Sequence, residues 1–375
     1  MTTDAVELAR ELIRFDTINP PGQEKACAEH LGRKLEAAGF RCDYIEMGEG
    51  RANLVARIGG APERSPLAFT GHIDVVPLGA RAWSVAPFGG ETGDGKVFGR
   101  GASDMKSGVA AFVAAAIDIA PRLGTGPGVV LVITAGEETG CEGAFHVART
   151  AHGLLGTAGA LVVAEPTSNR PLVGHRGALW LKAATKGVTA HASMPDRGVN
   201  AVYKAARAIS KLEDFDFNVA RHPVLGSPTL NVGWVRGGMN INSVPDLAEV
   251  GIDIRTIPAQ THNKVKKQLA AYLGEEVELS ALLDVEGVWT EPGHPWMQAV
   301  FETAREVTGA APEVEAAPFF TDASALAPAL GGVPTVILGP GPTHMAHQTD
   351  EYCEIARIEV AVEINRRLIA GWCGL

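Results

Sequence analysis

Short apolar runs alternate with amphipathic stretches along the first 170 residues of the chain. Runs at residues 66–70, 129–134 and 160–164 have the length of buried strands, and a fourth run lies at residues 333–338. Gly and Pro clusters between the periodic stretches mark loops. Because strands that alternate with helices build parallel sheets with crossover connections, the pattern predicts an α/β domain. We expect a mainly parallel sheet with helices on both faces.

The pattern of apolar positions changes after Gly174. The elements expected there follow the order strand, helix, strand, strand, helix, strand, which is the ferredoxin-like split unit. The strands are expected at residues 178–184, 228–235, 247–255 and 277–283, and the helices at residues 200–212 and 261–273. Alternation of helix and strand signals resumes near His294. We therefore expect a discontinuous α/β domain of residues 1–173 and 286–375, with an inserted α+β domain at residues 174–285.

Length, composition and charge narrow the class of protein. A chain of 375 residues suits about two domains, and 46% hydrophobic with 20% charged residues is typical of a soluble globular protein. The formal net charge of −10 argues against a nucleic-acid partner, since phosphate binding needs clustered Lys and Arg. The most apolar helical stretch, residues 109–117, ends at Asp118 and Pro121, well short of a membrane span. Residues 4–14 contain no apolar signal core.

The five cysteines are odd in number and include no C-x-x-C pair. They therefore indicate neither a disulfide framework nor a zinc–cysteine site. Together with the charge and the lack of a membrane span, this usage favours a cytoplasmic, reduced location. We expect no membrane partner.

Side chains that can bind a metal follow the predicted strands. In an open α/β sheet, residues distant in sequence converge at the carboxyl ends of parallel strands. The candidate ligands are His72, Asp104, Glu138, Glu165 and His347. Two imidazoles and three carboxylates suit a divalent ion such as zinc, with cobalt or manganese as alternatives. A single catalytic ion usually takes three protein ligands, so five ligands predict two ions that share Asp104.

Two short motifs suggest how the ligands are used. Adjacent residues in extended backbone point to opposite sides, so one of Glu137 and Glu138 can bind metal while the other acts as a base. We take Glu137 as the general base and Glu138 as the ligand, although the spacing does not decide between them. Asp74 follows His72 by two residues on the same side of the strand end, where its carboxylate can orient the imidazole.

Other kinds of site fit less well. Gly99-Arg-Gly101 lacks the third glycine of a dinucleotide-binding loop, and no Gly-x-Ser-x-Gly elbow is present. A non-catalytic binding protein with this fold remains an alternative. An intact Glu137 beside five ligands argues against it, because a binding protein has no use for a base there.

Together these motifs resemble a family of dinuclear metallohydrolases. The family contains acetylornithine deacetylases and succinyl-diaminopimelate desuccinylases, with aminoacylases, carboxypeptidases and dipeptidases. The resemblance spans nearly the whole chain, and its motifs are Gly71–Pro77, Gly99–Gly108, Thr134–Thr139, Glu165–Thr167 and the closing His347.

The resemblance implies roles for the candidate residues. It implies His72, Asp104 and Glu165 at one ion, Asp104, Glu138 and His347 at the other, and Glu137 as the base. A cis peptide bond after Asp104 is a further implication. The inserted domain, from about residue 174 to 285, would be a lid and dimerisation domain of a homodimer. Its His191 would reach the active site of the partner subunit.

Within the family, stretches such as Glu165–Ser168, Pro195–Ala201 and Ala346–Tyr352 are most similar to acetylornithine deacetylases. The stretch Asn240–Pro245 is closer to the desuccinylase form. The resemblance therefore implies hydrolysis of an N-acyl amino acid. N-acetylornithine, in arginine biosynthesis, is the first expectation. Desuccinylation of succinyl-diaminopimelate, another N-acyl amino acid, or a dipeptide or carboxypeptidase substrate are the alternatives.

Two lid residues are candidates for substrate contacts. Arg255 can bind the substrate carboxylate with two parallel hydrogen bonds, although a salt bridge between the domains is an alternative role. Asn242, together with His191, is expected to donate hydrogen bonds to the oxyanion that develops on the amide.

Overall fold

The computed structural model describes residues 3–60, 64–124 and 126–375. Contacts divide the chain into two compact units. The first unit comprises Met1–Gly174, Trp289–Ala317 and Thr321–Leu375, and the second comprises His175–Val288 with Pro318–Phe320. The chain thus enters and leaves the second unit within three residues of the bounds expected from sequence. The attachment of Pro318–Phe320 to the second unit was not expected.

The first unit is built on a mixed sheet whose centre is parallel. Strand β3 pairs in parallel with β6 on one side and β7 on the other, and β15 continues in parallel beside β7. Antiparallel strands flank this centre, with β2 against β6 and β8 against β15. In spatial order the strands are β1 (Arg41–Gly48), β2 (Arg51–Ile58), β6 (Val129–Thr134), β3 (Leu67–His72), β7 (Ala160–Val163), β15 (Thr335–Ile337), β8 (Leu172–His175) and β13 (Val288–Trp289), and β14 (Glu315–Ala317) pairs with β8.

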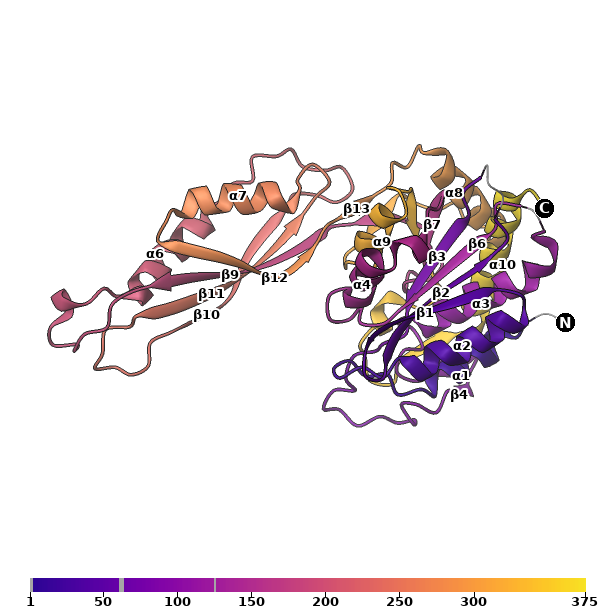
Figure 1. Cartoon of the computed structure of the whole chain (residues 1–375), viewed down its shortest axis with the longest axis horizontal. Helices are drawn as coiled ribbons and strands as arrows, with labels where there is room; N and C mark the ends of the chain where they lie inside the picture. Colours follow the sequence, from indigo (N-terminus) through magenta and orange to yellow (C-terminus); the bar gives the residue numbers. More distant parts are fainter. Residues whose placement is uncertain (1–2, 61–63, 125) are drawn as a thin grey trace. The chain divides into compact units, whose positions relative to one another are not determined.

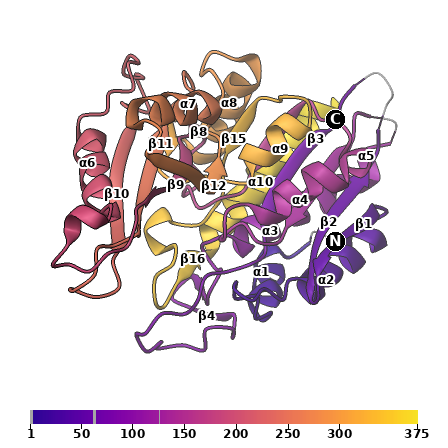
Figure 2. The same ribbon diagram turned by 60° about the vertical axis from the view of Figure 1, so that its left-hand side comes forward.

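Helices cover both faces of this sheet, so the expected α/β class is confirmed (Figures 1 and 2). Helices α1, α3 and α10 pack against one another, α8 packs against α10, α2 packs on β1 and β2, and α4 contacts α9. Their bounds are α1 (Ala5–Ile13), α2 (Lys25–Ala37), α3 (Lys106–Ile119), α4 (Glu142–Thr150), α5 (His152–Leu155), α8 (Pro295–Thr308), α9 (Ala323–Ala329) and α10 (Ile355–Cys373). A small sheet of β4 (Glu91–Gly93), β5 (Lys96–Phe98) and β16 (Tyr352–Glu354) completes the unit.

Helix α3 contains the most apolar helical stretch of the sequence, residues 109–117, and is buried. Its side chains from Val109 to Ala116 are inaccessible to solvent, as expected for a helix that is apolar on all sides. Gly108 lets its first turn approach β7 closely, because a Cβ atom there would lie 2.1 Å from the carbonyl oxygen of Ala164. This approach brings the loop before α3 next to the end of β7. Among the described residues, no helix is both long and apolar enough to cross a membrane.

The second unit has the expected ferredoxin-like order of elements. Its antiparallel sheet has the spatial order β10, β11, β9, β12, and α6 and α7 pack on one face of it (Figure 1). The bounds are β9 (Gly177–Lys186), α6 (Ala201–Glu213), β10 (Thr229–Gly237), β11 (Leu247–Thr256), α7 (His262–Leu273) and β12 (Val277–Val285). Alternate residues such as Leu179, Leu181 and Ile252 form the core beneath the helices. The opposite face exposes Trp180 and Leu282.

Candidate metal centre

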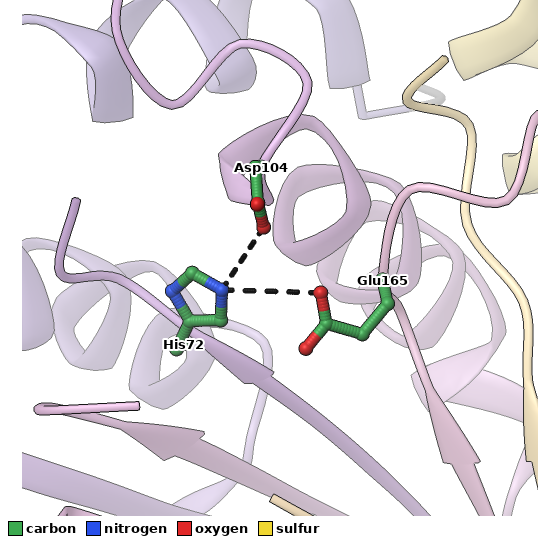
Figure 3. Close-up of side chains that lie close together, drawn as sticks. All are labelled: His72, Asp104 and Glu165. Carbon is green, nitrogen blue, oxygen red and sulfur yellow. Dashed lines mark hydrogen bonds and ion pairs between the residues drawn. The ribbon is translucent and has the colours of Figure 1, made fainter. Parts of the chain in front are cut away.

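The first three candidate ligands meet at the carboxyl ends of two parallel strands. His72 ends β3, and Glu165 lies two residues beyond the neighbouring strand β7. Asp104 comes from the loop before α3. One ring nitrogen of His72, Nε2, lies 3.2 Å from Oδ1 of Asp104 and 4.0 Å from Oε2 of Glu165, so the imidazole lies between two carboxylates (Figure 3).

A second group shares Asp104 with the first. Nε2 of His347 lies 3.5 Å from Oδ2 of Asp104 and 3.1 Å from Oε2 of Glu138. In each group of three residues, the potential ligand atoms lie within 4.8 Å of one another. Asp104 therefore directs one oxygen to each group, which is the arrangement that a carboxylate bridging two ions requires.

Electrostatics and hydrogen bonding fit a pair of cations. Burial raises the pKa of Glu165 well above its ordinary value, and nearby carboxylates add to this effect against the opposing influence of His72. Burial opposes the charged form of His72, but Asp104 and the other surrounding carboxylates raise its pKa well above 6.5. Oε1 of Glu138 is buried and makes no hydrogen bond within the described part of the chain. Divalent cations would neutralise this excess of carboxylates and give that oxygen a partner.

Glu137 and Glu138 are held by the same carboxylate, that of Asp74, but they have different places in the site. The backbone N–H groups of both residues donate to the carboxylate of Asp74, at 3.1 and 3.2 Å. Glu138 belongs to the second ligand group, whereas Glu137 belongs to neither. Burial, followed by repulsion from Glu165, raises the pKa of Glu137 well above its ordinary value. A buried carboxylate of this kind beside the ligands has the character of a proton acceptor.

Asp74 contacts both the His72 ring and the turn that carries Glu137. Nδ1 of His72 lies 3.0 Å from the main-chain oxygen of Asp74 and 3.5 Å from its Oδ1. The carboxylate of Asp74 also accepts the two backbone N–H groups of Glu137 and Glu138, together with the side-chain amide of Asn19 at 3.0 Å. The nearest group that orients His72 is thus a carbonyl, and the carboxylate holds the turn that carries Glu137.

Several polar side chains beneath the centre were not anticipated from sequence. Asp322 accepts a hydrogen bond of 2.5 Å from Oγ1 of Thr134, and burial raises its pKa to about 6. Arg100 and Glu351 form a buried ion pair. Glu351 lies in the stretch Ala346–Tyr352, but nothing in the local pattern of Asp322 or Glu351 separates them from surface carboxylates. The cis peptide bond expected between Asp104 and Met105 is present.

The remaining candidates belong to the second unit. His191 is exposed in the loop after β9, where its Nδ1 lies 2.7 Å from Oγ of Ser193. The loop of Asn242 pairs with that of His191 through the N–H of Ala192, which donates to the Asn242 carbonyl at 3.0 Å. Arg255 makes two hydrogen bonds to Asp253 of the same strand, at 2.8 and 3.1 Å. The roles of these three residues stay predictions.

Comparisons with known proteins identify the family of this chain. A family model described as peptidase family M20/M25/M40 matches residues 68–371. A succinyl-diaminopimelate desuccinylase of Cereibacter sphaeroides is 32% identical over 99% of this chain and 100% of its own length. A desuccinylase of Xanthomonas campestris pv. campestris is also 32% identical, over 98% of this chain and 99% of its own.

Solved structures share the fold at lower identity. The M20 family metallo-carboxypeptidase Sso-CP2 from Sulfolobus solfataricus superposes with a TM-score of 0.80 at 20% identity, covering 100% of both chains. The YXEP protein of Bacillus subtilis, described as a dinuclear metal binding peptidase, has a TM-score of 0.73 at 17% identity, covering 99% of this chain and 98% of its own.

The names of the two desuccinylases leave one expectation from sequence unsupported. The likeness to acetylornithine deacetylases, and with it a place in arginine biosynthesis, finds no support in the names of these relatives. Both of these relatives are named succinyl-diaminopimelate desuccinylase, which is the first alternative that the sequence suggested. The family itself follows from the match over most of the chain and from relatives above 30% identity over nearly its full length. The chain belongs to peptidase family M20/M25/M40 and is a metal-dependent amide hydrolase of that family.

Proposed function

We propose that the protein hydrolyses the amide bond of an N-succinyl amino acid, with N-succinyl-diaminopimelate as its substrate. The observation that carries the proposal is the pair of ligand groups that share Asp104, with Glu137 beside them. The names of relatives that match nearly the whole chain support the choice of acyl group.

Five side chains would hold two divalent ions. His72, Asp104 and Glu165 would bind one ion, and Asp104, Glu138 and His347 the other. Zinc is our first choice for the metal, with cobalt or manganese as alternatives, because this mixture of imidazole and carboxylate ligands suits all three. When bound, such ions polarise the substrate carbonyl and make the attacking water more acidic.

Glu137 would transfer the proton. Its carboxylate takes a proton from the attacking water and then donates that proton to the amine that leaves, so that the same side chain serves as base and acid. The backbone N–H groups of Glu137 and Glu138 donate to the carboxylate of Asp74, which holds the backbone of Glu137 in place. Positioning of this kind is needed because proton transfer requires hydrogen-bond distance to the reacting atoms.

Residues of the second unit would bind the substrate. Arg255 has five N–H donors, and Asp253 receives only two hydrogen bonds from it, so a substrate carboxylate can share the guanidinium. Asn242 and His191 would donate to the developing oxyanion. We also propose a homodimer in which His191 serves the site of the partner subunit. The second unit would then act as both the lid and the dimerisation domain.

N-acetylornithine is a second candidate substrate. The stretches Glu165–Ser168 and Ala346–Tyr352, which contain the candidate ligands Glu165 and His347, favour it through their likeness to acetylornithine deacetylases. Both candidates are α-amino acids with an acylated nitrogen, so the same centre and the same base would serve either one.

A substrate panel tests the proposal. The zinc-loaded enzyme would be assayed for release of free amine from N-succinyl-diaminopimelate, N-acetylornithine, other N-acyl amino acids and dipeptides, with Glu137→Gln as the blank. We expect the highest kcat/KM for N-succinyl-diaminopimelate. A preference for N-acetylornithine would move the assignment to the second candidate, and a preference for dipeptides would contradict the proposed deacylation.

A further inference from the structure

The carboxylate of Glu351 is buried against the backbone of the Asp104 loop. Its side chain is inaccessible to solvent, and each of its oxygens accepts two hydrogen bonds. Oε1 accepts from the N–H groups of Ser103 and Asp104, at 2.8 and 2.9 Å. Oε2 accepts from the N–H of Gly101 at 3.0 Å and from Arg100 at 2.7 Å. Three backbone N–H groups within four residues of one loop therefore converge on a single side chain.

Arg100 extends this contact to two other loops. Its guanidinium is 1% exposed and also donates to the main-chain oxygens of Pro77 at 3.2 Å, Gln348 at 3.2 Å and His347 at 3.5 Å. The loop after β3, the Asp104 loop and the His347 loop are thus joined by one buried ion pair.

We propose that Glu351 is a positioning residue for the metal centre, acting with Arg100. The pair holds the Asp104 and His347 loops so that the ligand atoms of both residues converge before an ion arrives. This inference rests on the proposed assignment of Asp104 and His347 as ligands.

A role in fold stability alone does not explain why the hydrogen bonds of Arg100 and Glu351 reach the two loops that carry Asp104 and His347. Burying an ion pair costs desolvation, and apolar side chains of similar size often replace such pairs without loss of stability. The hydrogen bonds to Glu351 instead come from Arg100 and the backbone of the Asp104 loop, and two of the other three hydrogen bonds of Arg100 reach the His347 loop. Groups that orient metal ligands from behind typically change metal affinity or activity by about 10 to 100-fold when they are removed.

Glu351→Gln is the most direct variant. An amide offers one acceptor oxygen and one NH₂ group, so one pair of hydrogen bonds is lost whichever way the amide turns. In the apoprotein, we expect faster hydrogen exchange at the amides of residues 101–104. In titrations with Zn²⁺ against a competing chelator, we expect about 10 to 100-fold weaker binding, with the larger loss at the ion assigned to Asp104, Glu138 and His347, because both loops that carry its ligands Asp104 and His347 lose support.

Asp118→Asn is the matched control. Asp118 is also a mostly buried carboxylate that accepts a backbone N–H, from Thr3 at 2.7 Å, and pairs with an arginine, Arg366 at 2.8 Å. It lies near the end of α3 that is opposite to Asp104. This variant should lower the melting temperature and leave the affinity for both ions unchanged. A merely structural role for Glu351 predicts the same result for Glu351→Gln.

The inference is overturned if Glu351→Gln binds both ions within about twofold of wild type while Asp104→Asn weakens binding, since about 10-fold is the least effect that a group orienting a ligand should have. If Asp104→Asn itself binds both ions like wild type, the ligand assignment and the inference fail together. Should Glu351→Gln not fold, Arg100→Lys decides. Lysine keeps the charge opposite Glu351 but has fewer donors for the loop carbonyls, so metal binding should again be weaker. Unchanged affinity in that variant would equally contradict the role.

Discussion

The two units of the chain differ in how many charged side chains they bury. The buried Asp, Glu, Arg and Lys side chains of the described residues all belong to the first unit: Glu24, Asp74, Arg100, Lys106, Glu137, Glu165, Asp322 and Glu351. The second unit buries two histidines, His175 and His262. The core of the second unit is apolar, with leucine, isoleucine, valine and alanine beneath its helices. Because an unpaired buried charge is costly, a unit that buries so many needs partners for them, and bound cations are such partners. We therefore expect the metal ions and the base in the first unit. The second unit would contribute only through exposed residues.

The largest effect on activity is expected at Glu137, which we assign as the base, in contrast to its neighbour Glu138, which we assign as a ligand. Glu137→Gln should lower kcat by about 10² to 10⁴, the usual contribution of a positioned acid–base group, and leave both ions bound. Glu138→Gln should instead weaken one ion, because it removes a ligand oxygen. Metal titration and steady-state kinetics on both variants make the check. Loss of metal from Glu137→Gln, or near-normal turnover, would contradict the separation of roles.

Mixing two inactive variants tests whether the second unit acts across a dimer. His191→Ala and Glu137→Gln chains would be refolded together. If His191 acts in trans, each heterodimer has one complete site. Random pairing makes about half of the dimers heterodimers, so roughly a quarter of wild-type activity should return. No recovery, in a preparation shown to contain heterodimers, would mean that His191 acts within its own chain or not at all.

Removal of metal should affect the first unit alone. Without ions, the carboxylates of Asp104, Glu138 and Glu165 repel one another. An ion that binds only the folded state adds about 2.7 kcal/mol at a free concentration 100 times its Kd. Chelation should therefore speed hydrogen exchange in β3, β6 and β7 and leave β9 and β11 unchanged. Equal changes in both units would show that metal binding is not confined to the first.

A smaller effect is expected at His175, where the second unit begins. Burial lowers the pKa of His175 to about 4, against the opposing effect of its hydrogen bond to the Arg176 carbonyl. The unfolded chain therefore binds the proton first. The stability that the neutral ring provides is present above pH 6.5 and is lost as the pH falls towards about 4.

Between pH 7 and 5, this loss should amount to about 2 kcal/mol in the free energy of unfolding. Denaturant unfolding of wild type and His175→Asn across that range measures it. The difference in stability between the two proteins should shrink by that amount as the pH falls. A difference that does not vary with pH would show that His175 is protonated in the folded protein.

The sequence predicted the elements of both units well, because their signals are local. In the second unit, each observed strand and helix begins or ends within two residues of the expected bounds. The ligands His72 and Glu165 were predictable for a similar reason. Each follows an apolar strand, and parallel strands place their carboxyl ends together.

The hydrogen bonds behind the ligands could not be predicted. Arg100 and Glu351 are 251 positions apart, and their meeting depends on loop conformations that apolar periodicity does not describe. His347 has a positive φ of 65°, which no residue pattern indicates. The carboxylate of Asp74 shows the same limit. Its position near His72 suggested a contact with the ring, which the structure has at 3.5 Å, but not its hydrogen bonds to the backbone of Glu137 and Glu138.

The location of bound ions tests the central claim most directly. Protein loaded with Co²⁺ would be crystallised, and anomalous scattering would count and place the ions. The account predicts two ions in each chain, one among His72, Asp104 and Glu165 and the other among Asp104, Glu138 and His347. A single ion at saturating metal, or ions outside these two groups, would contradict it.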